Sequence, residues 1–150
     1  MDEPTLQPPS LTALTTYLLS RTGKAGRQRL AERLAKRGLR LWHMAVLAAL
    51  ADFGPHAQRD LAVRLAIDPS DIAKIVEDIG ALGYVERMRD PADRRRVTVA
   101  LTETGRAALG EMHDETAAVQ DELLAPLTPA ERKQLTAMLS RVFTNLRSAT

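Results

Sequence analysis

Cysteine is absent from the 150 residues of this chain, which excludes disulfides, thiolate metal ligands and a cysteine-based redox switch. The histidines, His43, His56 and His113, show no His-x-x-x-His spacing. The sequence therefore predicts no metal and no cofactor, although separate ligands could still converge in three dimensions. Aromatic residues make up only 3% of the chain, so a core must be built mainly from Leu, Ala, Val and Ile.

Long apolar runs are also missing, since none approaches the roughly 20 residues of a membrane span. The start, MDEPTLQPPS, is acidic and proline-rich and lacks the basic and apolar parts of a signal peptide. We therefore expect a cytoplasmic protein with no membrane partner.

A strong excess of one charge is absent as well, because the formal net charge is only +2. Evidence for a nucleic-acid partner must therefore come from how the charges are distributed. Eight basic residues lie between Arg21 and Arg40, with Glu32 as the one acid among them. This segment is either a solvated helix face or a surface that adds positive potential near DNA phosphates.

Apolar residues at helical spacing predict four longer helices. After a disordered tail at residues 1–9, the first runs from Ser10 to about Arg37, and a nearly all-apolar one covers Leu39–Gly54. A third runs from Glu103 to about Leu124, and the last begins at Pro129, with Thr128 as its N-cap and Glu131 at its third position. The apolar stripe of the last helix comprises Leu135, Met138, Leu139, Val142 and Leu146. Such stripes must be buried either in the chain's own core or between subunits.

Two shorter helices between them form a helix-turn-helix pattern. An amphipathic segment, Ala57–Ile67, is followed by a helix with Asp68 at the N-cap, Pro69 at the first position and Asp71 at the third. That arrangement resembles a capping box, and Gly83 ends the helix. The second helix of such a pair can lie in a DNA major groove, which is about 12 Å wide.

The next segment, VERMRDPADRRRVTVALTETG, predicts two strands, YVERM and VTVAL, joined by a charged loop. Several arginines lie in or beside the loop among Asp90 and Asp93. The loop is either a solvated hairpin tip or a wing whose arginines reach an adjacent minor groove. The predicted fold is thus mainly α with a small β-hairpin wing.

With these motifs in place, the chain resembles the MarR (multiple-antibiotic-resistance regulator) family of winged-helix transcription factors. The stretches LAVRLAIDPSDIAKIVEDIGALGYVER, DPADRRRVTVALTETG and LTPAERKQL carry the resemblance. It implies a winged helix-turn-helix fold in a single domain, residues 10–150. Within it, residues 39–101 form the DNA-binding lobe, and residues 10–37 and 103–148 form the dimerisation helices. It further implies a homodimeric, ligand-responsive repressor that binds double-stranded DNA at a near-palindromic operator and is not an enzyme.

The resemblance also assigns candidate DNA-binding residues to the first short helix, the recognition helix and the wing. They are Gln58, Arg59, Pro69, Ser70, Asp71, Lys74, Arg94 and Arg95. Arg95 matches the wing-tip arginine of the family, and Asp93 matches the acid that orients its guanidinium. The alternative for this pair is a surface ion pair worth ~0–1 kcal/mol.

The recognition helix departs from the family at four of five groove-facing positions. The family often has Arg, Ser, Thr, Ser and Arg there, whereas this chain has Pro69, Ser70, Asp71, Ala73 and Lys74. Asp71 could accept a hydrogen bond from a cytosine amine, but its predicted role is to cap the helix. Lys74 keeps the positive charge without bidentate geometry.

Family members also bind small aromatic or anionic effectors between the dimer region and the lobe. The matching candidates are Arg40, Trp42, His43 and Met44. The alternative is that Trp42 and Met44 belong to the core and that His43 joins two helices.

Two other functional classes remain open. Some methyltransferases carry a winged-helix dimerisation domain, but this chain has no Gly-rich phosphate loop and no nucleophile–base pair in sequence. The other class is a protein-interaction or ligand-sink module that has lost specific DNA binding, which the departures at Asp71 and Ala73 suggest.

Overall fold

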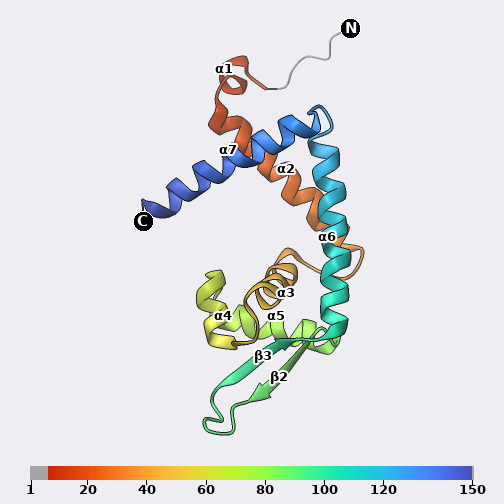
Figure 1. Ribbon diagram of the computed structural model, residues 1–150, viewed down its shortest axis with the longest axis vertical. Helices are drawn as coiled ribbons and strands as arrows, with labels where there is room; N and C mark the ends of the chain where they lie inside the picture. Colours follow the sequence, from red (N-terminus) through yellow and green to blue (C-terminus); the bar gives the residue numbers. More distant parts are fainter. Residues whose placement is uncertain (1–6, 150) are drawn as a thin grey trace. The chain divides into compact units, whose positions relative to one another are not determined.

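A computed structural model describes residues 7–149 of the chain, which form two compact units (Figure 1). The first unit comprises residues 7–26 and 117–149, and the second comprises residues 27–116. The boundaries between the units fall inside two long helices, α2 (Thr15–Ala35) and α6 (Glu103–Leu123). The expectation of a mainly α fold with a small β element is confirmed.

The first unit begins with a short helix, α1 (Pro9–Thr12), so the predicted single helix from Ser10 is wrong at its start. The hydroxyl of Thr12 donates a hydrogen bond to the carbonyl oxygen of Pro9 at 3.2 Å. A local bond of this kind competes with helix continuation, and α2 starts only at Thr15. The predicted tail overlaps α1 at Pro9, and its residues 1–6 lie outside the described residues.

The last helix, α7 (Pro129–Ser148), starts with a complete capping box, as its sequence predicts. The N–H of Glu131 donates to the hydroxyl of Thr128 at 3.2 Å, and the N–H of Thr128 donates to the Glu131 carboxylate at 2.9 Å. The backbone N–H of Thr128 thereby lowers the pKa of Glu131. No residue of α7, all of which the structure describes, is buried. Its exposed apolar residues are Met138, Leu139, Val142, Phe143 and Leu146.

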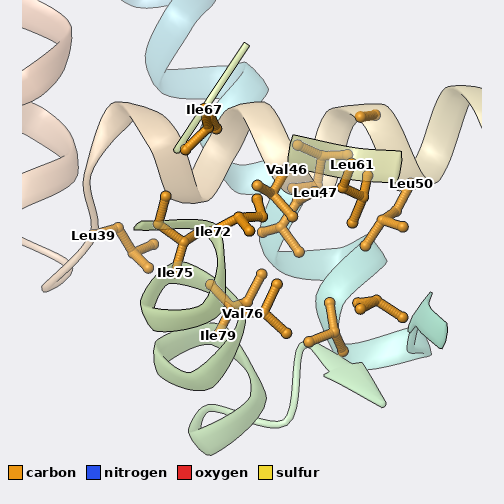
Figure 2. Close-up of a cluster of buried hydrophobic side chains, with 14 of the residues drawn as sticks. Leu39, Val46, Leu47, Leu50, Leu61, Ile67, Ile72, Ile75, Val76 and Ile79 are labelled. Carbon is orange, nitrogen blue, oxygen red and sulfur yellow. The ribbon is translucent and has the colours of Figure 1, made fainter. Parts of the chain in front are cut away.

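The core of the second unit lies where α3 (Leu41–Phe53), α4 (Gln58–Leu65) and α5 (Pro69–Ala81) meet (Figure 2). The side chains that fill it share aliphatic character and near-complete burial. They include Val46, Leu47, Leu61, Ile72, Val76 and Ile79. Burying each such side chain stabilises the fold by roughly 1.5–3 kcal/mol. This core holds α4 and α5 in the helix-turn-helix arrangement.

A three-stranded antiparallel sheet follows, in the order β1 (His56–Ala57), β3 (Val97–Leu101), β2 (Val85–Arg89). The predicted hairpin is therefore confirmed, and β1 adds a strand that the sequence does not predict. Two residues are too few to show an alternating pattern, which explains the omission. Val85 and Val99 bury the base of the hairpin against the core, and the hairpin projects beyond α5 (Figure 1).

Hydrogen bonds join the residue before α6 to the residues that precede β2. The Thr102 hydroxyl donates to the carbonyl oxygen of Gly83 at 2.6 Å, and the Thr102 N–H donates to that of Tyr84 at 3.0 Å. The Gly105 N–H in turn donates to the Thr102 hydroxyl at 3.0 Å. A Cβ atom at Gly105 would lie 2.0 Å from the Tyr84 carbonyl oxygen, so this position requires glycine.

Among residues 7–149, no helix combines the length and the apolar character needed to cross a membrane.

Candidate nucleic-acid interface

The helix-turn-helix of the second unit depends on a tight turn between α4 and α5. Ala66 ends α4 in the left-handed region, with φ 52° and ψ 45°. The N–H of Ile67 donates back to the Ala62 carbonyl at 2.9 Å, and the Ile67 side chain is buried in the core. At the other end of α4, Gln58 is half-buried and Arg59 is exposed. The turn therefore sets the direction in which α5 leaves the core.

The first turn of α5 is capped by Asp68, as predicted. Its carboxylate accepts hydrogen bonds from the Ser70 N–H at 2.8 Å and from the Ser70 hydroxyl at 2.5 Å. These two bonds, the hydroxyl one first, lower the pKa of Asp68. Ser70 is exposed, and its hydroxyl hydrogen is used within the protein, so toward solvent its oxygen offers only lone pairs.

The predicted capping role of Asp71 is wrong. Asp68 alone caps α5, and the Asp71 side chain forms no hydrogen bond or ion pair within residues 7–149. An aspartate is one methylene shorter than Glu131, which closes the capping box of α7 from the same position. The Asp71 carboxylate is exposed, and so is the Lys74 ammonium one turn further on. Pro69, the first residue of α5, is exposed as well.

The wing loop, residues 90–96, is shaped by two aspartates that bind its backbone. The Asp90 carboxylate accepts from the Ala92 N–H at 2.8 Å, and the Asp93 carboxylate accepts from the Arg95 N–H at 3.0 Å. The prediction that Asp93 holds the Arg95 guanidinium is therefore wrong, since Asp93 binds the backbone of that residue. The physical reason is local, because an Asx turn places the carboxylate beside the N–H two residues on.

The wing arginines consequently have different environments. Arg94 and Arg95 are exposed, and neither takes part in an ion pair within the described residues. Arg96 instead places its guanidinium 3.6 Å from the carboxylate of Asp60 on α4. Both partners are more than half exposed, so the pair contributes little stability but links the wing to the helix-turn-helix. Asp60 was missed by sequence analysis because its partner lies 36 residues away in the chain.

A pocket of about 340 Å³ lies between the start of α3 and the exposed side of α5. It brings together Arg40, Trp42 and His43 with Asp71 and Lys74. Its remaining lining residues are Ala66, Ile67, Asp68, Ile75 and Asp78. Trp42 is 50% exposed, so it is not a core residue.

Met44 does not line this pocket. Its sulfur lies 3.8 Å from the Thr116 hydroxyl, which donates its hydrogen to the Met112 carbonyl at 3.0 Å, so Met44 faces α6. Of the four predicted ligand-binding residues, three are therefore brought together and one lies elsewhere.

His43 is buried, with 5% of its surface exposed, and both of its ring nitrogens have partners. Nδ1 accepts a hydrogen bond from the Arg40 N–H at 2.9 Å, so the proton belongs on Nε2. Nε2 lies 3.2 Å from a carboxylate oxygen of Asp78 on α5 and donates to it. His43 thus joins the start of α3 to the recognition helix. Asp78 was missed by sequence analysis, although it lies one turn after Lys74 at helical spacing.

Within the part of the chain that the structure describes, no three His, Asp or Glu side chains gather in a way that could hold a metal ion.

Comparisons with known proteins connect this geometry to regulators. A family model described as MarR family matches residues 37–96, which cover most of the winged lobe. The transcriptional repressor NicR of Pseudomonas putida is 35% identical over 96 residues, covering 64% of this chain and 61% of NicR. The chain thus spans about three fifths of the length of that curated relative.

Solved structures match over more of the chain. A MarR-family transcriptional regulator from Rhodococcus sp. RHA1 has a TM-score of 0.73 and 26% identity, covering 90% of this chain and 96% of that one. BpsR of Bordetella bronchiseptica has a TM-score of 0.69 and 28% identity, covering 91% of this chain and 97% of that one. The BpsR structure concerns regulation of its DNA binding by 6-hydroxynicotinic acid.

Proposed function

This chain belongs to the MarR family, and we propose that it is a homodimeric, sequence-specific DNA-binding transcriptional regulator. We further propose that it is a repressor released by a small effector and that it acts in the cytoplasm on double-stranded DNA. MarR-family proteins are regulators, so no catalytic activity is expected of it.

The observation that carries the proposal is an exposed recognition helix beside a wing with exposed arginines. The first two turns of α5 present Ser70, Asp71 and Lys74 to solvent. The wing loop is held by its own hydrogen bonds, which leaves the guanidiniums of Arg94 and Arg95 exposed. A helix of this kind fits a major groove, and exposed arginines on a hairpin fit the narrow, electronegative minor groove beside it.

Dimer formation is supported by the apolar residues that the first unit leaves exposed. From α1, α2 and the residues between them they include Leu11, Leu14 and Leu18, and from α7 they include Val142 and Leu146. Large exposed apolar patches mark interaction sites, and a symmetric pair of subunits would bury these faces on each other. We expect Val142→Asp combined with Leu146→Asp to halve the mass measured by light scattering. A dimer that persisted in this variant would contradict the assignment of these residues to the interface.

The experiment that tests DNA binding is fluorescence anisotropy with duplex from the region upstream of the protein's own gene, with a scrambled duplex alongside, over a salt series. We expect selective binding that weakens steeply as salt increases, because protein cations displace counterions from phosphates. Arg95→Ala should weaken binding and reduce the magnitude of the salt slope by about 2 for a dimer if each arginine contacts one phosphate.

Arg141→Ala is the matched control, since Arg141 is also an exposed arginine and lies on α7. It should leave the affinity unchanged. Weak and equal binding to both duplexes, followed by failure to enrich any sequence from random DNA, would refute the proposal.

The effector proposed here is a small aromatic acid bound in the pocket between α3 and α5. Arg40 and Lys74 offer cations to a carboxylate, and the half-exposed indole of Trp42 offers a surface on which a ring can stack. BpsR responds to 6-hydroxynicotinic acid, which has this chemistry and serves as the probe. Because Trp42 is the one tryptophan of the chain, saturable binding should change its fluorescence.

The same probe should release bound DNA over the same concentration range. Met44→Leu, outside the pocket, should respond like the wild type, whereas Arg40→Ala should bind the probe more weakly. Release of DNA without any change in Trp42 fluorescence would place the effector site elsewhere.

A second candidate function is a dimeric protein-interaction or ligand-sink module. The observation that favours it is the acidic character of the exposed side of α5, where Asp71, Glu77 and Asp78 surround Lys74. Such a face is repelled by phosphates. The anisotropy titration separates the two candidates, because the module would bind neither duplex selectively.

A further inference from the structure

We infer that Asp71 reads cytosine in the operator, so that the recognition helix selects bases by their amino groups rather than by the guanine edge. This inference rests on the proposed DNA-binding function and names the base that this helix selects. It replaces the capping role that the sequence predicts for Asp71.

The first support is that Asp71 is available for an external partner. Its carboxylate lies in the first turn of α5, is exposed and has no hydrogen bond or ion pair within residues 7–149. The cap that could have engaged it is already made by Asp68, which binds both the N–H and the hydroxyl of Ser70. In helix-turn-helix proteins, side chains of this first turn are those that contact base edges.

The second support is that the exposed start of α5 presents mainly acceptors. Asp71 offers two carboxylate oxygens, and Ser70 offers lone pairs because its hydrogen is donated to Asp68. Lys74 is the one cation that the described residues place on the exposed side of α5. This chain has no arginine within α5, so the bidentate contact that most often selects guanine is not available from this helix.

The base edges then decide which partner such a helix prefers. Guanine presents two acceptors in the major groove and thymine presents one, so both repel a carboxylate. Adenine presents its amino donor beside the N7 acceptor, which suits an amide better than a carboxylate. Cytosine presents its N4 amino group without a neighbouring acceptor, so it is the base that Asp71 accepts from.

The negative charge of Asp71 also weakens binding to DNA in general, because it lies near phosphates in every register. A carboxylate in this position therefore favours one base while opposing all other sequences, which is a way to increase specificity. Removing the charge should raise affinity for random duplex and lower the preference for cytosine. A residue with only a structural role would not produce this pair of opposite changes.

The experiment is selection from a pool of random duplexes with the full-length wild type, Asp71→Asn and Glu77→Gln. Glu77 is the matched control, since it is another exposed carboxylate on α5 but lies beyond the first turn. We expect a cytosine at one position of each half-site for the wild type and for Glu77→Gln. For Asp71→Asn we expect adenine there, because an asparagine side chain can bond to both N6 and N7.

Anisotropy titrations then give the size of the effect. Replacing that cytosine by thymine in one half-site should weaken wild-type binding by about five- to tenfold and leave Asp71→Asn little affected. Asp71→Asn should also bind random duplex more tightly than the wild type. Thermal unfolding of both variants should match the wild type, since the two side chains are exposed.

The outcomes distinguish this inference from the function on which it rests. If no protein enriches any sequence, the proposed function fails and the inference fails with it. If the wild type enriches a site and Asp71→Asn enriches the same one with equal preference, DNA binding stands and the role of Asp71 is overturned.

Discussion

Replacing Gly105 by alanine tests how α6 is joined to the winged lobe. The added Cβ would lie 2.0 Å from the Tyr84 carbonyl oxygen, 1.0 Å closer than the 3.0 Å limit that Cβ contacts respect. The nearest atom belongs to the backbone, so no side chain can rotate away. Relief requires moving Tyr84 and the start of α6 apart, which loses the bond from the Thr102 N–H to the Tyr84 carbonyl. That bond is worth about 1 kcal/mol, and overpacking typically costs about 1–3 kcal/mol more.

We therefore expect Gly105→Ala to lower the free energy of unfolding by roughly 3 kcal/mol, or the melting temperature by about 10 °C. Gly110→Ala is the control on the same helix, because no atom lies within 4 Å of its added Cβ. It should stabilise α6 by up to about 1 kcal/mol through helix propensity. Calorimetry at one fixed protein concentration measures both, since melting of a dimer depends on concentration. A Gly105→Ala protein as stable as the wild type would refute the steric argument.

Three further predictions concern the wing, the turn and the acid response. Asp93→Asn should keep wild-type DNA affinity, because its amide oxygen can still accept from the Arg95 N–H, whereas Asp93→Ala should bind DNA more weakly. If anisotropy showed that both variants lose affinity equally, the charge of Asp93 would matter instead of its hydrogen bond. Ala66→Gly should raise the free energy of unfolding by about 1 kcal/mol in urea titrations, because Ala66 has φ 52°; an unchanged midpoint would contradict the strain. Hydrogen bonds, that from Arg33 first, lower the pKa of Glu115, so its stabilising effect is present above the ordinary glutamate pKa. The stabilising effect of Glu115 is lost as the pH falls through its lowered pKa. On acidification, the free energy of unfolding should therefore decrease more for the wild type than for Glu115→Gln. Equal decreases in the two proteins would argue against this linkage.

Local features of the chain were predicted well from its sequence. The caps at Asp68 and Thr128, the strand Val97–Leu101 and the end of α5 before Gly83 all follow from the identity of residues within one or two turns. The failures are also local in their cause. The helix break before Thr15 involves the Thr12 hydroxyl, which competes for the Pro9 carbonyl oxygen. The spacing of apolar residues does not reveal such a hydrogen bond.

The candidate site was predicted less completely, because its geometry depends on which atoms of a side chain meet a partner. Sequence spacing placed Asp93 beside Arg95 but did not distinguish the guanidinium from the backbone N–H. It placed Asp71 at the third helical position but did not show that an aspartate side chain is too short to complete the capping box of α5. The partners of His43 and Arg96 lie on elements far away in the chain.

The sequence alone was sufficient for the succession of helices α3 to α7, the turn between α4 and α5 and the charged hairpin loop, since periodicity, caps and turn residues act between neighbours. Packing was needed to bring Trp42 and Lys74 to one pocket, to place Asp78 beside His43 and to make Gly105 indispensable. Each of these depends on atoms that approach through space from separate segments. Patterns in the sequence do not predict these contacts, because the contacts depend on how the core positions the helices.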